Sequence, residues 1–361
     1  MTSAADTLGI YIHVPFCLRK CPYCDFYSCE NRLHERNAYV QAVCRNIRYY
    51  GDGRKVDTIY FGGGTPSLLL PESIAEIICT IEKFFSIISP EITMEVNPAT
   101  VTPEKLIGYR KAGVNRLSIG LQDLNNDSLV SLGRLHTAEQ GVEAVYDAVK
   151  AGFENISCDL MIGTKGQTKE RLAQTLEQLT TLPITHISAY MLKIEDGTPY
   201  AVQNMQHYVP DEDETAELYL QMVSYLIEKG FSQYEISNFA QKNFESRHNC
   251  RYWKLLPYLG IGPASHSFMD KRFYVPSDLD LFIKKEHQDT FIEDECPDLS
   301  EERIMLGLRL SEGIPLSWLD EEQIKSVERF IKGGLMEKIS DMIRFTPKGF
   351  LVSNAVLCEI L

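Results

Sequence analysis

The sequence predicts an α/β protein: an incomplete parallel βα barrel of six units, followed by a small C-terminal domain. Three observations lead to this prediction. Short apolar segments of strand length alternate with longer amphipathic segments of helix length over most of the chain. Polar and reactive residues follow several of the strand segments, and the alternation ends near residue 275. Serial alternation of this kind is typical of a parallel sheet covered by helices.

Six strand–helix units are expected in series. The strands are expected at about 8–14, 56–61, 91–97, 114–120, 155–161 and 184–191. The helices are expected at about 32–50, 71–88, 102–112, 137–151, 168–180 and 211–229. Two helix starts carry clear signals: Pro71 opens one, and Thr102 before Pro103 supplies an N-cap for another. Right-handed crossovers then lead either to a barrel or to a doubly wound sheet.

Polar and reactive residues at successive strand ends favour the barrel. In chain order they are Cys17, Cys21 and Cys24 after the first strand, 62–66 after the second, 95–98 at the third, Gln122 and Asp123 at the fourth, and Asp159 in the fifth. Barrels place their chemistry at the carboxyl ends of successive strands. A doubly wound sheet concentrates it at one switch point instead.

The pattern changes after residue 275. Helical segments are expected near 299–310 and 320–332, and a glycine pair and short apolar runs around 343–345 then indicate a small hairpin. We therefore expect two domains, 1–275 for the barrel with the site and 276–361 for the C-terminal domain.

Composition excludes several classes of function. The chain has 361 residues, of which 44% are hydrophobic, and a net charge of −14. A surface this acidic repels phosphate backbones, so non-specific nucleic-acid binding is not expected. No apolar run reaches the ~18 residues of a membrane span. Ten cysteines without a visible secretory signal indicate a reducing compartment, the cytoplasm.

Three cysteines in one short loop, Cys17, Cys21 and Cys24, are the strongest sign of chemistry. Thiolates select zinc, copper(I) or iron–sulfur clusters. Clusters are usually held by four cysteines. A cluster held by these three would leave one iron open to an exchangeable ligand.

Two other interpretations remain open from spacing alone. One is a redox pair formed by Cys21 and Cys24. The other is a structural zinc site, which needs four ligands. The candidates for its fourth ligand are Cys29, His13 and His34.

Several longer motifs carry a family resemblance. They are YIHVPFC (11–17), CPYCDF (21–26), YFGGGTPS (60–67), SIGLQ (118–122), YEISN (234–238) and HNCRYW (248–253). With them the chain resembles the radical SAM superfamily, and within it the oxygen-independent coproporphyrinogen III oxidase-like family. It is similar to the haem chaperones of that family. The resemblance implies a three-quarter barrel with a winged-helix-like C-terminal domain.

The resemblance also implies cofactors and their contacts. A [4Fe-4S] cluster would bind Cys17, Cys21 and Cys24, and its open iron would be chelated by S-adenosylmethionine. Tyr11 would lie beside the adenine. The other residues implied to bind the cofactor are Tyr23, Gly63, Gly64, Thr65, Glu95, Gln122, Arg134 and Asp159. Carboxylates suit ribose hydroxyls and an amino group, and an arginine suits a carboxylate.

A histidine among cations and aromatics is compatible with a haem site, but a lone histidine is more often structural than a ligand. His248 lies in the run 247–254, which contains three other cationic residues, and haem needs an axial ligand, flat walls and cations for its propionates. The resemblance implies His248 as the haem ligand, with Cys250 as a competitor. For His266 we expect a buried, hydrogen-bonded side chain.

Two functions fit this resemblance, because one scaffold serves both. The first is a haem chaperone that takes up haem and passes it to a recipient such as a respiratory enzyme. The second is oxidative decarboxylation of coproporphyrinogen III. Phe26 favours the chaperone, because the oxidases carry a cysteine at that position. The implied partners are haem or porphyrin, a haem-accepting protein, an electron donor and a second copy in a homodimer. A zinc-stabilised barrel without radical chemistry is the third hypothesis.

Overall fold

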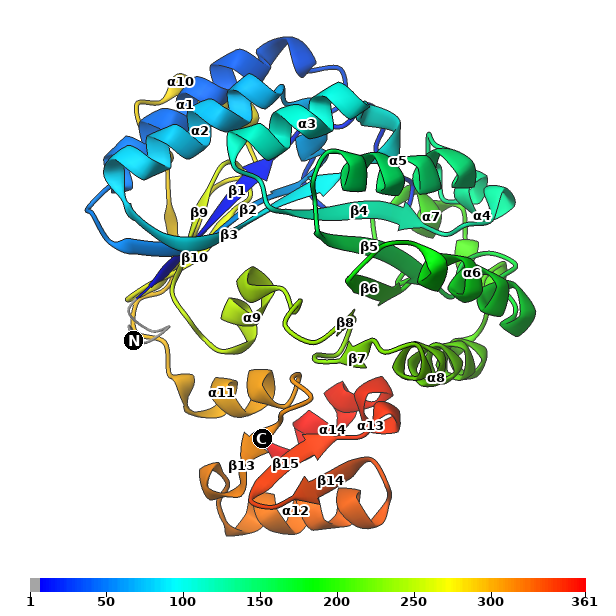
Figure 1. Cartoon of the computed structure of the whole chain (residues 1–361). Coiled ribbons are helices and arrows are strands. Elements are labelled where there is room, and N and C mark those ends of the chain that lie inside the picture. Colours follow the sequence, from blue (N-terminus) through cyan, green and yellow to red (C-terminus); the bar gives the residue numbers. More distant parts are fainter. Residues whose placement is uncertain (1–6) are drawn as a thin grey trace.

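The computed structural model describes residues 7–361 and shows a curved sheet with helices along its outer side (Figure 1). The six expected strands form and run parallel as neighbours. Their bounds are β1 (Leu8–Val14), β2 (Lys55–Gly63), β3 (Ser86–Val96), β4 (Arg116–Gln122), β5 (Asn155–Ile162) and β6 (His186–Met191). The predicted α/β class with a parallel sheet is therefore confirmed.

The sheet continues beyond these strands at both edges. On the β1 side, β9 (Tyr258–Ile261) pairs in parallel, and β10 (His266–Phe268), β11 (Arg272–Tyr274) and β12 (Phe291–Asp294) follow antiparallel. On the β6 side, β8 (Asn238–Ala240) and β7 (Ser232–Gln233) are added. The sequence did not predict these strands, because segments of two to four residues carry too little alternation to be recognised.

The six expected helices lie along the outer face of the sheet (Figure 1). They are α1 (Arg36–Tyr50), α2 (Pro71–Phe84), α3 (Pro103–Ala112), α5 (Ala138–Lys150), α6 (Lys169–Thr181) and α8 (Glu212–Glu228). The shorter helices are α4 (Asn126–Ser131), α7 (Pro199–Val202), α9 (Arg247–Trp253) and α10 (Leu279–Lys284). Turns of 3-10 helix occur at Leu33–Glu35, Pro66–Leu68, Pro98–Thr100, Met205–His207 and Leu316–Trp318.

The start of α3 agrees with its predicted capping signal, whereas the end of α2 differs from its predicted position. The Thr102 side chain accepts a hydrogen bond from the Lys105 amide and so caps α3, as expected. Helix α2 ends at Phe84 instead of near residue 88, because Ser86 and Ile87 already pair with β2. The β-branched residues after the helix therefore begin a strand.

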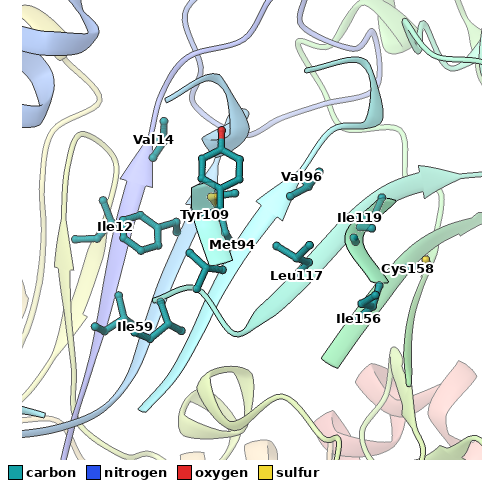
Figure 2. Close-up of a cluster of buried hydrophobic side chains, with 14 of the residues drawn as sticks. Ile12, Val14, Ile59, Met94, Val96, Tyr109, Leu117, Ile119, Ile156 and Cys158 are labelled. Carbon is teal, nitrogen blue, oxygen red and sulfur yellow. The ribbon is translucent and has the colours of Figure 1, made fainter. Parts of the chain in front are cut away.

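The two faces of the parallel strands differ in chemistry. Figure 2 shows apolar side chains of β1 to β5 gathered in one buried cluster, which Tyr109 of α3 joins. The cluster residues alternate along each strand with polar ones, as Ile59 with Tyr60 and Met94 with Glu95. The core thus lies between the sheet and the outer helices, and the other face is left for polar residues.

A second core forms in the C-terminal domain. This domain contains α11 (Leu299–Gly307), β13 (Ile314–Pro315), α12 (Glu321–Lys332), β14 (Met336–Ile339), β15 (Met342–Phe345), α13 (Pro347–Leu351) and α14 (Ser353–Ile360). Its three strands form a separate sheet in the order β13–β15–β14, which contains the expected hairpin. In Figure 1 it lies beneath α9 and β7, where Glu235 bridges to Leu310.

The first core extends beyond residue 275, where the sequence suggested the domain division. Leu279 and Phe282 of α10 pack into the barrel core, and β12 still belongs to the large sheet. The second core begins at Ile304. The two cores therefore divide between β12 and α11. In residues 7–361, no helix combines the length and apolarity needed to cross a bilayer.

Replacing a core isoleucine should destabilise the fold. Ile119 is fully buried on β4, and Ile119→Ala should lower the free energy of unfolding by about 2–5 kcal/mol through lost burial and a residual cavity. Urea denaturation at neutral pH measures this change. The matched control is Ile227→Ala on α8, whose side chain is 53% exposed, and it should stay near the wild type. Equal loss in both variants would show that Ile119 does not contribute through burial.

Candidate functional site

A cavity of about 600 Å³ opens at the carboxyl ends of the barrel strands. We call it the cysteine cavity. It brings together most of the residues expected to bind the cluster and S-adenosylmethionine. Those that line it are Cys17, Cys21, Cys24, Tyr23, Gly63, Gly64, Thr65, Glu95, Gln122, Arg134 and Asp159. Tyr11 and His248 are the two expected residues that do not line it.

The backbone fixes the cysteine loop against the end of β1. The Cys17 amide donates to the Cys29 carbonyl at 3.0 Å, and the Cys29 amide donates to the Pro15 carbonyl at 2.6 Å. The Cys29 side chain contacts the Tyr27 hydroxyl and does not line the cavity. Burial raises the pKa of the Cys17 and Cys24 thiols, so the free thiols are protonated at neutral pH.

The geometry of the donors does not match a single-ion site. Within residues 7–361, no three His, Cys, Asp or Glu side chains converge closely enough to hold one metal ion. A zinc ion needs four ligands, each about 2.0–2.3 Å from one centre. The described side chains therefore do not form a closed single-ion site in this structure.

Glycines bring the second strand end against this loop. A Cβ on Gly64 would lie 2.7 Å from the Phe16 carbonyl oxygen and 3.2 Å from the Cys17 sulfur. Gly63 has φ +109°, and a Cβ there would lie 2.7 Å from the His13 ring. Only glycine permits both contacts. Gly63 and Gly64 therefore permit the close approach of this run to the end of β1 and the cysteine loop.

Strand β4 ends in a strained turn with a cation beside it. Gln122 has φ +68°, a left-handed conformation that is unfavourable for a residue with a Cβ. Arg134 donates through Nη2 to the Gly120 carbonyl at 2.8 Å and through Nη1 to the Cys21 sulfur at 3.7 Å. Its Nε has no hydrogen-bond partner in the described part of the chain. Arg134 thus offers a donor and a positive charge next to the cysteines.

Two carboxyl groups lie deeper in the cavity, and both are electrostatically perturbed. Glu95 accepts from the Tyr60 hydroxyl at 2.9 Å and from the Gly63 amide at 3.2 Å. Burial and the nearby Asp159 raise the pKa of Glu95 to about 8. Burial raises the pKa of Asp159 to about 6, although Ser118 donates to it at 2.9 Å. A cationic ligand group placed between them would reverse both shifts.

Sequence reasoning missed Arg116, which lines the same cavity. Its side chain is 1% exposed, and its Nε has no hydrogen-bond partner among the described residues. A buried donor without a partner is costly, so an anionic ligand group that accepted from this Nε would be stabilising. The available signal was a charge at the start of the apolar segment 116–121, at a position that shares a face with Ser118.

His248, the expected haem ligand, lies on α9 with both ring nitrogens engaged. Its Nδ1 is 2.9 Å from the Thr58 hydroxyl and its Nε2 is 2.9 Å from the Tyr252 hydroxyl. The ring is fully buried, and burial together with Arg251 lowers its pKa to about 3. Arg251 itself pairs with Asp57 at 2.5 Å. Ligation of haem iron by His248 would require the hydrogen bond to Tyr252 to open.

Cys250, the competing ligand, is also held away from both cavities. Burial raises the pKa of its thiol to about 12, so it is protonated at neutral pH. A buried thiol without a nearby cation strong enough to ionise it is a poor axial ligand.

Tyr11 and His266 line a second cavity of about 600 Å³ beside the first. The two cavities share Lys20, Asp25 and Phe26. The expectation of a buried His266 is wrong: its side chain is 58% exposed. His266 begins β10, and only the two residues after it, Ser267 and Phe268, are buried.

The pKa of Glu95 predicts a pH dependence of stability in the protein without cofactors. Folding raises this pKa from its ordinary 4.5 to about 8, so the folded chain holds more protons than the unfolded chain in that interval. Stability contributed by Glu95 therefore falls as pH rises from about 5 to about 9. Glu95→Gln should show a smaller decline in urea unfolding free energy over this range. Glu228→Gln, an exposed control, should follow the wild type; an identical decline in both variants would contradict the assignment.

Comparison with known proteins identifies the family. A model of the radical SAM superfamily matches residues 11–179, and a model of the HemN C-terminal domain matches residues 297–352. The chain is 32% identical to "Heme chaperone HemW" of Haemophilus influenzae over 97% of both chains. It is also 32% identical to "Heme chaperone HemW" of Escherichia coli, again over 97% of both.

A solved structure matches the fold. The coproporphyrinogen III oxidase HemN from Escherichia coli, a radical SAM enzyme, superimposes with a TM-score of 0.86 over 99% of this chain and 91% of that one. The sequence identity is 21%, so this likeness concerns the fold alone. The sequence relatives reach further, because they match both domains at above 30% identity. The chain therefore belongs to the HemW family within the radical SAM superfamily.

Proposed function

We propose that this chain is a haem chaperone, which binds haem and transfers it to a recipient protein. The observation that carries the proposal is the match to proteins named heme chaperone over 97% of both chains. Phe26 supports it, because an exposed phenylalanine stands beside the cysteines, where the coproporphyrinogen oxidases carry a further cysteine. The cysteine cavity alone would serve either activity.

The residues of the cysteine cavity fit a [4Fe-4S] cluster with S-adenosylmethionine, the cofactors of the radical SAM superfamily. When bound, the cluster supplies an electron and an open iron for chelation of S-adenosylmethionine. We propose Cys17, Cys21 and Cys24 as its ligands. The glycine cradle supports this fit, because Gly64 leaves room beside the Cys17 sulfur that a Cβ would fill.

The remaining side chains of the cavity suit the polar groups of S-adenosylmethionine. Arg134 and Arg116 each present a nitrogen without a partner among the described residues, and a carboxylate would accept from it. Glu95 and Asp159 favour a positive group between them, because proximity to a cation restores their ordinary acidity. Exclusion of water from this buried region strengthens each of these interactions.

We propose that the chain acts in the cytoplasm and gives haem to a respiratory enzyme. The ten cysteines, none of them in a disulfide within the described residues, support a reducing compartment. An electron donor and a homodimer belong to the same proposal and rest on the family resemblance alone.

Haem binding without porphyrin turnover is the direct test of the chaperone. The protein is reconstituted anaerobically and titrated with haem, and coproporphyrinogen III is supplied in a separate assay with S-adenosylmethionine and a reductant. We expect a Soret band that saturates at a fixed haem stoichiometry and no protoporphyrinogen product. Turnover of coproporphyrinogen III in the absence of haem binding would reverse the proposal in favour of the oxidase.

Cysteine variants test the cluster ligands. Cys17→Ser, Cys21→Ser and Cys24→Ser should each lose the iron and the acid-labile sulfide after reconstitution, because two thiolates do not hold the cluster. Cys29→Ser is the matched control, since its sulfur lies outside the cavity, and it should keep the full iron and sulfide content. Loss of the cluster in Cys29→Ser, or stoichiometric zinc in the wild-type protein, would refute this ligand set.

A further inference from the structure

A continuous hydrogen-bonded path leads from the cysteine cavity toward helix α9. It begins at Asp159 and Ser188, which both line the cavity, and Ser188 is hydrogen-bonded to the Asp159 carboxyl group. Ser157 Oγ lies 3.3 Å from Ser188 Oγ and 2.7 Å from His186 Nδ1. His186 Nε2 in turn lies 2.8 Å from the Tyr234 hydroxyl. These side chains form one path along the inner face of the barrel, which we call the histidine path.

The register of two neighbouring strands builds the first part of the histidine path. Strands β5 and β6 pair in parallel, with Ser157 opposite His186 and Asp159 opposite Ser188. Residues two apart in a strand share a face, so both pairs point to the same side of the sheet. Ser157, His186 and Ser188 are each at most 3% exposed. Water therefore competes little for their hydrogen bonds, which strengthens each of them.

The path ends at the first turn of α9, the helix that carries His248 and lies on the inner side of the curved sheet (Figure 1). The Tyr234 hydroxyl accepts a hydrogen bond from the Ser246 amide at 3.2 Å. Ser246 is the N-cap of α9, and its hydroxyl accepts from the Asn249 amide at 3.3 Å. The amide of an N-cap has no partner within its own helix, so Tyr234 supplies one from outside.

Donor and acceptor capacities allow only one direction along the path when Asp159 is ionised. A carboxylate only accepts, so the Ser188 hydroxyl donates to it, and Ser157 must then donate to Ser188. Ser157 has no second hydrogen and therefore accepts from His186 Nδ1–H, while His186 Nε2 accepts from the Tyr234 hydroxyl. Burial lowers the pKa of His186 well below its ordinary 6.5, so the ring is neutral and donates from one nitrogen only.

We infer that His186 is a positioning residue, which couples Asp159 in the cysteine cavity to the first turn of α9. While Asp159 is ionised, His186 holds its proton on Nδ1 and Tyr234 donates to Nε2. A protonated Asp159 can itself donate to Ser188, which permits the opposite direction and the Nε2–H tautomer. That reversal changes the hydrogen bonding of the Tyr234 oxygen, which accepts from the Ser246 amide. This coupling involves only side chains and one amide of the protein, so it does not depend on the proposed function.

Other ionisable groups face the histidine path, so the titration must be assigned to Asp159 by substitution. Burial raises the pKa of Asp159 to about 6, against the hydrogen bonds and cations around it. Burial also raises the pKa of Glu235, which acts on Tyr234, to about 7, and that of Glu95, which faces Asp159, to about 8. The remaining ionisable groups that act on Asp159, His186 or Tyr234 are Tyr60, Arg116, Arg134, Cys158, Tyr190 and Cys250.

Nitrogen-15 NMR of the histidine rings tests the inferred tautomer in the full chain without cofactors. The His186 ring is assigned through its backbone amide and by its absence from His186→Gln. Well above the pKa of Asp159 we expect the Nδ1–H tautomer. Lowering the pH through about 6 should shift both ring nitrogens, and the Ser246 amide should shift with the same midpoint. Asp159→Asn should abolish both pH-dependent shifts, whereas Glu235→Gln should keep them.

Matched serine variants separate the histidine path from other contacts of the same carboxyl group. Ser188→Ala interrupts the path, so the Ser157 hydroxyl becomes free to donate to His186 and the single tautomer should be lost. Ser118→Ala removes a different hydroxyl, which donates to Asp159 at 2.9 Å, and it should keep the wild-type tautomer. The thermal midpoint of each variant reports whether it is folded. Retention of the tautomer in a folded Ser188→Ala would contradict the path.

Matched tyrosine variants test the connection to α9. Tyr234→Phe should remove the pH-dependent shift of the Ser246 amide, because the hydroxyl that accepts from it is gone. Tyr200→Phe, whose hydroxyl donates to the Ser131 carbonyl, is the control and should keep that shift. The Nε2–H tautomer in the wild type at high pH, or an unchanged pH response in a folded Asp159→Asn, would overturn the inference. Both results are obtained without haem or cluster, so they are distinct from a failure of the proposed function.

Discussion

The separation of apolar and polar side chains onto opposite faces of the parallel strands positions the rest of the structure. Ile59 and Met94 pack toward the outer helices, whereas the neighbouring Tyr60 and Glu95 face the cysteine cavity. Parallel sheets are usually buried on both faces and are apolar throughout. Here the inner face can be polar because the curved sheet leaves room there for a ligand instead of a second layer of helices. A shift of one residue in register would exchange the two faces and abolish both the core and the site.

The cysteine cavity also requires the carboxyl ends of β1 and β2 to lie close together. The cysteine loop follows β1 and the glycine run follows β2, so their register brings Val14 beside Gly63. The Gly64 amide then donates to the Val14 carbonyl at 2.8 Å. Larger residues at 63 and 64 would push the cysteine loop outward. The cysteine loop and the glycine run are therefore one structural unit, although residues 25–61 lie between Cys24 and Gly62 in the sequence.

Much of this arrangement could be predicted from the sequence, and the failures have physical causes. The six parallel strands were predictable because each carries several buried β-branched or aliphatic residues at alternate positions. Strands β7 and β10 could not be predicted. They are strands because of the neighbours with which they pair, and their own residues carry no strand signal. The start of β3 was assigned to the preceding helix, since Ile87 and Ile88 fit either period.

The same holds for the site: some of its residues could be identified from the sequence, whereas their hydrogen bonds and exposure depend on tertiary packing. Many residues of the cysteine cavity were predictable, because parallel strand ends meet at one edge and because the motifs resemble those of a known family, whereas Arg116 was missed. The state of His248 was not, because a sequence does not show that Thr58, distant along the chain, occupies its Nδ1. The exposure of His266 likewise depends on which face of β10 packs against the barrel. A histidine motif therefore indicates a region, and hydrogen bonding decides whether the ring nitrogens of that histidine already have partners.

The polar groups of the inner face are balanced only when a ligand of mixed charge is present. Glu95 is held protonated near neutral pH by burial and by Asp159, whereas Arg116 and Arg134 keep nitrogens without partners among the described residues. The charges of Arg116 and Arg134 lower the pKa of Asp159, but burial outweighs them. S-adenosylmethionine carries an amino group, a sulfonium and a carboxylate, so it can satisfy both sets at once. The buried carboxyl groups and the unpartnered arginine nitrogens thus favour a ligand that carries both charges.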